Sequence, residues 1–240
     1  MNSHASTKDK GMPPAITFVY MGRIVGNCYI IRTEIGFILI DTGRGSKRTR
    51  LEKELDTLGC RPGNLNLILL THGDFDHTGN CAYLRDMFGT KIAMHADDSG
   101  MVEYGDMFYN RKTGGFLIKG IVNLLFRIRK FKPDFFVDDG YDLSEYGLDA
   151  KVIHLPGHSK GSIGVLTASG DLFCGDLFVN IKKPELNSII DDPMEASASA
   201  EKLRGYEIRM VYPGHGRPFP MNLMTSRRDE EPVPGQHFVG

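Results

Sequence analysis

The sequence predicts an α/β fold in which two β-sheets pack together and helices cover their outer faces. Two observations predict it. Short apolar runs and amphipathic segments recur in both halves of the chain, with glycine-containing turns between them. Most of the strand-like runs follow one another closely enough to form hairpins, which favours two packed sheets over one open parallel sheet. A chain of 240 residues can bury a large apolar core, so we expect one domain.

The elements of the first half are assigned from residue type and spacing. β-Branched and aromatic residues separated by short turns indicate three antiparallel strands at the start. Leucines at helical spacing then indicate a helix that ends near Gly59, and a continuous apolar run indicates a strand buried on both faces. In order, we expect strands at residues 15–20, 28–33 and 36–41, a helix at 48–58, a strand at 65–70, a helix at 80–88 and a strand at 91–95.

The second half repeats this pattern of strands and helix. We expect strands at residues 151–155, 162–168 and 171–175, a helix at 194–203 and a strand at 208–212. The polar N-terminus and the charged, proline-containing C-terminus indicate segments outside the core. The expected organisation is therefore a flexible tail at 1–13, one domain at 14–220 with a helical insertion at about 99–133, and a C-terminal extension at 221–240.

Composition and charge exclude several classes of protein. The 29 basic and 30 acidic side chains leave a net charge of −1, which gives no bulk attraction for nucleic acid or for an anionic membrane. The apolar runs are too short to cross a bilayer, so we expect no stable membrane insertion. The four cysteines form no CxxC pair and no apolar leader is visible, so we expect buried free thiols and a cytoplasmic location.

Four of the eight histidines stand just after apolar, strand-like runs, beside glycine and aspartate. If these strands are neighbours that run in the same direction, their ends bring the polar side chains to one rim of the fold. The predicted ligands are His72, Asp74, Asp76, His77, His158, Asp176 and His215. Seven nitrogen and oxygen ligands suit two divalent cations and are too many for one tetrahedral ion. We expect His95 and His154, which also lie near strand ends, to be structural.

The spacing predicts how these side chains divide between two ions. Residues two apart in an extended segment point to the same side, so His72 and Asp74 can approach one ion together. Asp76 and His77 are adjacent and need a turning backbone to face a second ion. Asp176, with two carboxylate oxygens, is the natural bridge. Imidazole and carboxylate ligands without cysteine suit zinc, iron or manganese.

Several short motifs follow the strand-like runs: DTG at 41–43, HGDFDH at 72–77, GHSKGS at 157–162, GD at 175–176 and GH at 214–215. Together they resemble the metal-binding motifs of the metallo-β-lactamase-fold superfamily. The resemblance implies a four-layer αββα sandwich of two mixed β-sheets flanked by helices, with a metal site at one edge. It also implies a hydrolase, as most members are, and it implies that Asp41 supports the ligands from behind without binding metal.

The residue at position 74 departs from the superfamily pattern. That pattern reads HxHxDH, whereas this chain has Asp74 where the second histidine is expected. The flavodiiron branch also carries a carboxylate there, a glutamate, and uses iron. We expect Asp74 to ligate directly; the alternatives are that it acts through water or leaves the first ion weakly held. The centre is then either one tight and one labile site, or a dinuclear site biased toward iron or manganese.

The predicted function is that of a dinuclear metal-dependent hydrolase. Two divalent ions, with zinc favoured over iron and manganese, would lower the pKa of a bridging water, so that hydroxide attacks an ester, thioester, lactone or phosphoester of a small molecule. The predicted catalytic residues are His72, Asp76, His158 and His215, of which Asp76 orients the water. The alternatives are a diiron redox protein without its flavin domain and a non-catalytic metal-binding relative. Among thioesters, a glutathione thioester is disfavoured, because we expect no C-terminal helical domain of the glyoxalase II type.

The segment between the two halves carries a local positive charge. Residues 107–133 contain no acid and seven lysine or arginine side chains. Apolar residues at helical spacing predict a basic amphipathic helix, formed by Leu117, Ile121, Leu124, Ile128 and Phe131. We favour a helix packed on the core over a lid for an anionic or lipophilic substrate, and over a membrane-surface contact or the contact of a homo-oligomer.

Overall fold

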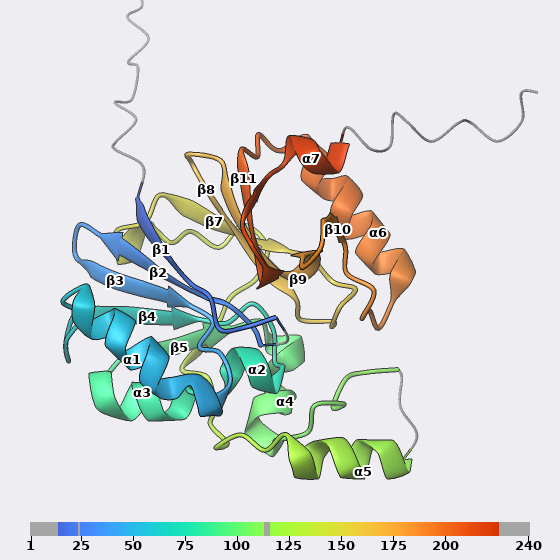
Figure 1. Cartoon of the computed structure of the whole chain (residues 1–240), viewed down its shortest axis with the longest axis horizontal. Helices are drawn as coiled ribbons and strands as arrows, with labels where there is room; N and C mark the ends of the chain where they lie inside the picture. The colour runs from blue at the N-terminus through green and yellow to red at the C-terminus, as the bar shows by residue number, and fades with distance from the viewer. Residues whose placement is uncertain (1–13, 24, 113–115, 226–240) are drawn as a thin grey trace, which may run out of the picture.

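Two six-stranded sheets form the centre of the molecule, with helices on their outer sides (Figure 1). The computed structural model describes residues 14–23, 25–112 and 116–225. The predicted N-terminal tail and most of the predicted C-terminal extension lie outside the described residues. The arrangement is the αββα sandwich that the motifs imply, so the predicted fold class is confirmed.

The first sheet contains the strands of the N-terminal half in chain order. They are β1 (Ala15–Val19), β2 (Cys28–Thr33), β3 (Gly36–Ile40), β4 (Leu65–Leu69), β5 (Lys91–Met94) and β6 (Phe135–Phe136). β1, β2 and β3 form the predicted antiparallel meander, whereas β3 to β6 run parallel. Leu67, Ile68 and Leu69 of β4 are fully buried, as expected for a central strand covered on both faces.

The second sheet contains the strands of the C-terminal half. They are β7 (Ala150–His154), β8 (Ile163–Thr167), β9 (Asp171–Asn180), β10 (Pro184–Leu186), β11 (Met210–Gly216) and β12 (Phe219–Pro220). Their order is β12-β11-β9-β8-β7, and β10 pairs with the end of β9. β7, β9 and β11 run in the same direction, because β8 is antiparallel to β7 and β9 while β11 is parallel to β9. The three strands nearest the second-half motifs therefore point toward one edge.

Helices lie on the outer sides of the two sheets (Figure 1). They are α1 (Arg48–Thr57), α2 (Phe75–Thr78), α3 (Cys81–Phe88), α4 (Ala96–Tyr104), α5 (Phe116–Leu125), α6 (Pro193–Lys202) and α7 (Asn222–Thr225). Leu51 and Leu55 of α1 pack into the core outside the first sheet, and Ala196 and Ala200 of α6 pack outside the second. Among the described residues, no helix is long and apolar enough to cross a membrane.

The two sheets share an apolar layer between them. Tyr29 and Ile38 of the first sheet belong to the same buried cluster as Val152 and Phe173 of the second. The rings of Tyr29 and Phe173 meet edge-on, with centroids 5.2 Å apart. Such aromatic contacts across the layer, together with the buried area, hold the sheets at a fixed separation. The polar side chains at the edge of this layer are therefore held by both sheets.

The predicted helix of the insertion is shorter than its apolar spacing suggests. α5 ends at Leu125, and residues 127–133 are not helical. Phe131 is 5% exposed and belongs to the core outside the first sheet, and its N–H donates to the carbonyl of Val102. Pro133 also disfavours helical backbone at the preceding residue. The prediction that Ile128 and Phe131 continue the helix is wrong, because these side chains pack on the core from non-helical backbone. Ile121 and Leu124 of α5 are each 59% exposed, so the favoured packing of this helix on the core is also wrong for these two side chains.

The strand predicted at 171–175 is also longer than expected. β9 continues through Asp176 to Asn180, so Asp176 lies inside a strand and not after its end. The pairing of β9 with β11 is irregular here, with register shifts on either side of Pro213. Gly175 adopts a left-handed φ of 50°, which a glycine accommodates without strain. Irregularities of this kind change the direction of side chains locally, and Asp176 of β9 and His215 of β11 both lie in this part of the pairing.

Candidate metal centre

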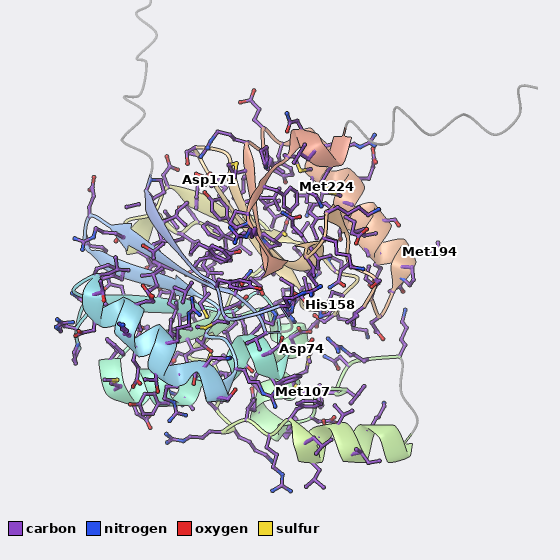
Figure 2. The ribbon with its side chains drawn as sticks, viewed as in Figure 1. Asp74, Met107, His158, Asp171, Met194 and Met224 are labelled. Carbon is purple, nitrogen blue, oxygen red and sulfur yellow. The ribbon has the colours of Figure 1, made fainter. Side chains whose placement is uncertain are left out.

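All seven predicted ligands come together at the edge where the ends of β4 and β7 approach the irregular part of β9 and β11. Residues 72–77 follow β4 and include α2, and His158 follows β7. Asp176 lies in β9 and His215 in β11. Figure 2 shows Asp74 and His158 close to each other at this edge. The first sheet thus supplies four of the side chains and the second sheet three.

The side chains fall into two groups that could each hold a cation. His72, His158 and Asp176 offer ligand atoms within 4.8 Å of one another. Asp74 adds Oδ2, which is 3.5 Å from Nε2 of His72 and 3.0 Å from Nε2 of His158. Two ligand atoms of one tetrahedral zinc ion lie roughly 3.3 Å apart, given zinc–nitrogen distances of about 2.0–2.1 Å. We call this set the first ligand group.

The second ligand group consists of Asp76, His77 and His215. Nε2 of His215 is 3.4 Å from Oδ2 of Asp76. Asp176 stands between the two groups: its Oδ1 is 3.4 Å from Nε2 of His77, and its Oδ2 is 3.3 Å from Nε2 of His215 and 3.9 Å from Nε2 of His158. The carboxylate is therefore placed where the sequence predicts a bridge.

Asp41 sets the orientation of two of the histidines. Its carboxylate accepts hydrogen bonds from the Thr71 N–H at 2.8 Å, the Thr71 hydroxyl at 2.7 Å and Nδ1 of His77 at 2.8 Å. Because the Thr71 hydroxyl proton is committed to Asp41, Nδ1 of His72 donates to Thr71 Oγ1, 3.0 Å away. The protonated Nδ1 atoms leave the Nε2 lone pairs of His72 and His77 directed at the candidate metal positions. Asp41 also has a φ of 55°, the one positive value at a non-glycine residue among those described.

Several ligand atoms of the centre are buried without a hydrogen-bond partner. Nδ1 of His158 donates to the Ile189 carbonyl at 2.6 Å, which likewise leaves its Nε2 lone pair facing inward. Among the seven candidate ligands, the unpartnered buried atoms are Nε2 of His72, Nε2 of His77, Oδ1 of Asp74 and Oδ1 of Asp176, and Nε of Arg111 beside them is also unpartnered. Buried polar atoms are normally hydrogen-bonded, and the four ligand atoms can each donate an electron pair to a cation. A cation between them satisfies the arrangement, so the residues fit a metal centre.

The pKa values of the buried carboxylates and histidines at the centre are shifted by their mutual contacts. Burial alone would raise the pKa of Asp176, but His215 and His77 hold that pKa well below its usual range. Burial alone would lower the pKa of His77, but Asp176 and Asp41 raise it well above its usual range. In the metal-free protein, these carboxylates therefore favour protons on the neighbouring imidazoles. A divalent ion has to displace these protons in order to bind.

We expect metal binding to stabilise the protein more as the pH rises from about 6 to 9. Burial alone would lower the pKa values of His77, His158 and His215, but carboxylates raise each of them, chiefly Asp176 for His77 and His215 and Asp74 for His158. The stability from these protonated imidazoles is fully present below pH 6.5, the unfolded value, and is lost as pH rises through the raised folded values.

The measurement is the melting temperature of chelator-treated protein with and without zinc, in buffers of increasing pH. The metal-free melting temperature should fall over this window while the gain from zinc grows. The lowered pKa of Asp176 does not interfere, because its contribution is lost only as the pH falls below 3.8. A zinc effect that shrinks with rising pH would contradict the assignment of these histidines as ligands.

Gly26 is needed because the backbone passes directly over the second ligand group. Its N–H donates to Oδ2 of Asp76 at 3.1 Å. A Cβ at this position would lie 2.6 Å from Nε2 of His77 and 2.7 Å from the Asp76 carbonyl oxygen. We expect Gly26→Ala to remove the ion of the second group, because the new methyl group occupies the space in front of the imidazole nitrogen.

Metal content by inductively coupled plasma mass spectrometry tests this prediction. Gly120→Ala is the matched control, since a Cβ at Gly120 in α5 would meet nothing within 4 Å. The control should retain the wild-type metal content, and alanine within the helix should stabilise it by about 0.5–1 kcal/mol. If Gly26→Ala also retained the wild-type metal content, the second group would not be a metal site.

Arg111 belongs to the centre although its role is not visible in the sequence. Its Nη2 donates to Oδ2 of Asp74 at 2.8 Å and lies 3.3 Å from Nε2 of His158. Burial alone would raise the pKa of Asp74, but Arg111 and then His158 hold it well below its usual range. The sequence shows only a run of basic residues here. The sequence gives one indication of such a residue: Asp74, in place of a histidine, adds a buried negative charge that needs a positively charged partner.

His95 and His154 form a third cluster with Asp138. Their rings stack with centroids 4.4 Å apart and planes 6° apart, so their in-plane lone pairs do not converge on one ion. Nδ1 of His95 accepts a hydrogen bond from the Asp97 N–H at the start of α4, and Nε2 of His154 donates to the Lys160 carbonyl. Both side chains therefore serve the scaffold, as expected from the sequence.

Comparison with known proteins identifies the family of this chain. A family model described as the Metallo-beta-lactamase superfamily matches residues 21–215. The chain is 26% identical over 190 residues to the Beta-lactamase-like protein 2 homolog of Drosophila melanogaster, with 79% of this chain and 58% of that protein covered. It is 32% identical over 156 residues to the Hydroxyacylglutathione hydrolase GloC of Haemophilus influenzae, with 63% and 66% covered.

Among solved structures, the chain resembles TTHA1623 in a di-iron-bound form. The two share 25% sequence identity and superpose with a TM-score of 0.67, over 89% of this chain and 97% of that one. The chain spans less than two thirds of the length of the fly and Haemophilus influenzae proteins, whereas it matches nearly the whole of this solved chain.

Proposed function

The chain belongs to the metallo-beta-lactamase superfamily, and from this membership we propose that it is a dinuclear metal-dependent hydrolase. The proposed substrate is an ester, thioester, lactone or phosphoester of a small molecule. The observation that carries the proposal is the set of buried, unpartnered nitrogen and oxygen atoms on both sides of Asp176. Two divalent ions held there would supply hydroxide at neutral pH and polarise the oxygen of a carbonyl or phosphoryl group.

The proposed roles of the side chains follow from their positions. His72, Asp74 and His158 would hold one ion, Asp76, His77 and His215 the other, and Asp176 would bridge them. Asp76 has its Oδ2 fixed by the Gly26 N–H at 3.1 Å, so that carboxylate can also orient a water molecule by accepting its hydrogen bond. Asp41 would keep His77 and His72 in the tautomer that presents Nε2.

Zinc is the proposed metal, and iron is the principal competitor. Imidazole and carboxylate ligands suit both, and a carboxylate at position 74 adds oxygen character that iron and manganese tolerate well. The relative solved in a di-iron-bound form supports iron. The relative named Hydroxyacylglutathione hydrolase supports a thioester among the candidate substrates, including the glutathione thioester that the sequence disfavours.

The test combines metal loading with a substrate panel. Metal-free protein would be loaded separately with zinc, iron and manganese and assayed against p-nitrophenyl esters, acyl thioesters, lactones and phosphodiesters. We expect at least one class to be hydrolysed, and His158→Ala to lose both activity and metal. The proposal is wrong if no class is hydrolysed by any loaded form and His158→Ala binds metal as well as the wild type does.

A diiron redox protein is the second candidate, and Asp74 is the residue that favours it. The di-iron form of a similar structure adds support. This candidate predicts visible absorption after aerobic iron loading and consumption of oxygen or nitric oxide when an electron donor is supplied. Iron-loaded protein that hydrolyses an ester but consumes neither gas would exclude it. Metal binding without either activity would indicate a non-catalytic relative.

A further inference from the structure

We propose that Arg111 makes the two metal positions unequal, because its guanidinium competes directly with the ion of the first ligand group. This inference rests on the proposed metal-dependent function. It predicts one tightly bound ion in the second group and one weakly bound ion in the first. Arg111 would then decide at which metal concentration the centre becomes dinuclear.

The geometry places one N–H group of Arg111 where a cation would bind. Nη2 lies 2.8 Å from Oδ2 of Asp74 and 3.3 Å from Nε2 of His158, and those two atoms are themselves 3.0 Å apart. Nδ1 of His158 is committed to the Ile189 carbonyl, so Nε2 has a single lone pair to give. When Nε2 carries no proton, that lone pair can accept from Arg111 or bind an ion, but it cannot do both.

The position of Arg111 is fixed by the chain on both sides. The side chain of Asn110 donates to the Asp97 carbonyl at the start of α4. The backbone N–H of Lys112 donates to both carboxylate oxygens of Asp191, at 3.0 and 3.1 Å, and the ammonium of Lys112 is 2.6 Å from the carboxylate of Asp192. Arg111 therefore lies between two anchored residues, and its guanidinium is held at the centre.

The segment that anchors Lys112 also orients a ligand histidine. The N–H groups of Asp191 and Asp192 both donate to the carbonyl of Gly157, the residue before His158. Ile189 in the same segment accepts the Nδ1 hydrogen bond of His158. The segment at 189–192 therefore holds both Lys112, next to Arg111, and His158. An ion that displaces Arg111 has to disturb these contacts.

The two ligand groups differ in charge, because Arg111 contacts Asp74 of the first group. Among the ion pairs of the described residues, Arg111 pairs with Asp74, a candidate ligand of the first group. The other two carboxylate ligands, Asp76 and Asp176, pair with histidines. Histidine can lose its proton when an ion arrives, but arginine stays charged. An ion in the first group therefore meets a permanent positive charge within a few ångströms, and the repulsion weakens its binding.

The experiment is a titration of chelator-stripped, full-length protein with Zn²⁺ in competition with a chromophoric chelator. The variants are Arg111→Met, which keeps most of the side-chain length without charge, and Arg111→Lys, which keeps the charge but loses the planar N–H groups. Arg129→Met is the control, because Arg129 pairs with Asp86, 2.7 Å away, and is 65% exposed.

We expect the wild type to bind one Zn²⁺ at least tenfold more tightly than the second. Arg111→Met should tighten the weak site at least tenfold and leave the tight site unchanged, Arg111→Lys should fall between, and Arg129→Met should match the wild type. A second readout is stability: metal-free Arg111→Met should melt below the wild type, because the buried carboxylate of Asp74 loses its arginine partner, and should gain more from Zn²⁺.

The outcomes separate this inference from the proposed function. Two sites of equal affinity in the wild type, or a weak site that Arg111→Met leaves unchanged or weakens, would overturn the inference and leave the metal centre standing. Absence of Zn²⁺ binding by every variant would overturn both. If Arg111→Met does not fold, Arg111→Gln replaces it, since the neutral amide can still donate to Asp74.

Discussion

Asp176→Asn is expected to release both metal ions together and to lower hydrolysis by more than about a hundredfold, the upper end of the loss seen when only an outer partner of a ligand is removed. Asp176 is the side chain that contacts both ligand groups, with oxygens 3.3–3.9 Å from Nε2 of His77, His158 and His215. Asparagine keeps the shape but offers one neutral oxygen, which cannot bridge two cations. Metal content and the rate of the most active substrate are the two readouts.

Asp171→Asn is the control for this prediction. Asp171 is also a buried aspartate of β9, but its carboxylate pairs with Arg209, and Figure 2 shows it well away from Asp74 and His158. Asp171→Asn should lose stability while it keeps its metal. If Asp176→Asn retained two ions per chain, the bridging role of Asp176 would be wrong and the two ligand groups would have to be independent.

Asp41→Ala should destabilise the metal-free protein by about 3–5 kcal/mol, the range for removing one partner from a buried, charge-assisted pair. Asp41 is 2% exposed and accepts three hydrogen bonds, two from Thr71 and one from His77. Its loss leaves those donors buried without an acceptor. It also frees His77 and His72 to adopt the other tautomer, so metal affinity should fall as well.

Urea denaturation at neutral pH measures the first effect, and zinc competition titration the second. Asp41→Gly separates backbone from side chain, because glycine accepts the φ of 55° freely while it also lacks the carboxylate. Asp41→Gly should therefore be less destabilised than Asp41→Ala but equally impaired in metal binding. An Asp41→Ala protein within about 1 kcal/mol of the wild type would show that its hydrogen bonds are replaced by water.

The sequence predicts the fold and the grouping of the candidate ligands because both depend on local patterns. The meander of β1 to β3 follows from β-branched residues and short turns. The convergence of the loops after β4 and β7 follows from strands that end in histidine and aspartate. The family match confirms the resemblance carried by those motifs. These features depend only on the spacing of residue types along the chain and on the direction of the strands.

The features that the sequence does not predict depend on contacts between distant segments. Arg111 reaches Asp74 because Lys112 is anchored to residues 191 and 192, about eighty positions along the chain. α5 stops at Leu125 because Phe131 is buried beside Val102, which apolar spacing alone cannot show. Asp176 lies within β9 because the pairing with β11 continues past Gly175. In each case tertiary packing overrides a correct local pattern.

The division of the centre between the two sheets also sets when metal can be acquired during protein synthesis. The first ligand group needs His158 and Asp176 in addition to His72, and the second needs His215 in addition to Asp76 and His77. His215 lies in β11, which inserts between β9 and β12. A nascent chain on the ribosome can therefore complete the first group only after Asp176 has emerged, and the second only after His215 has emerged. Because each ligand group contains residues from both sheets, a chain that retains metal in both groups has completed its synthesis through β11 and has packed the two sheets together.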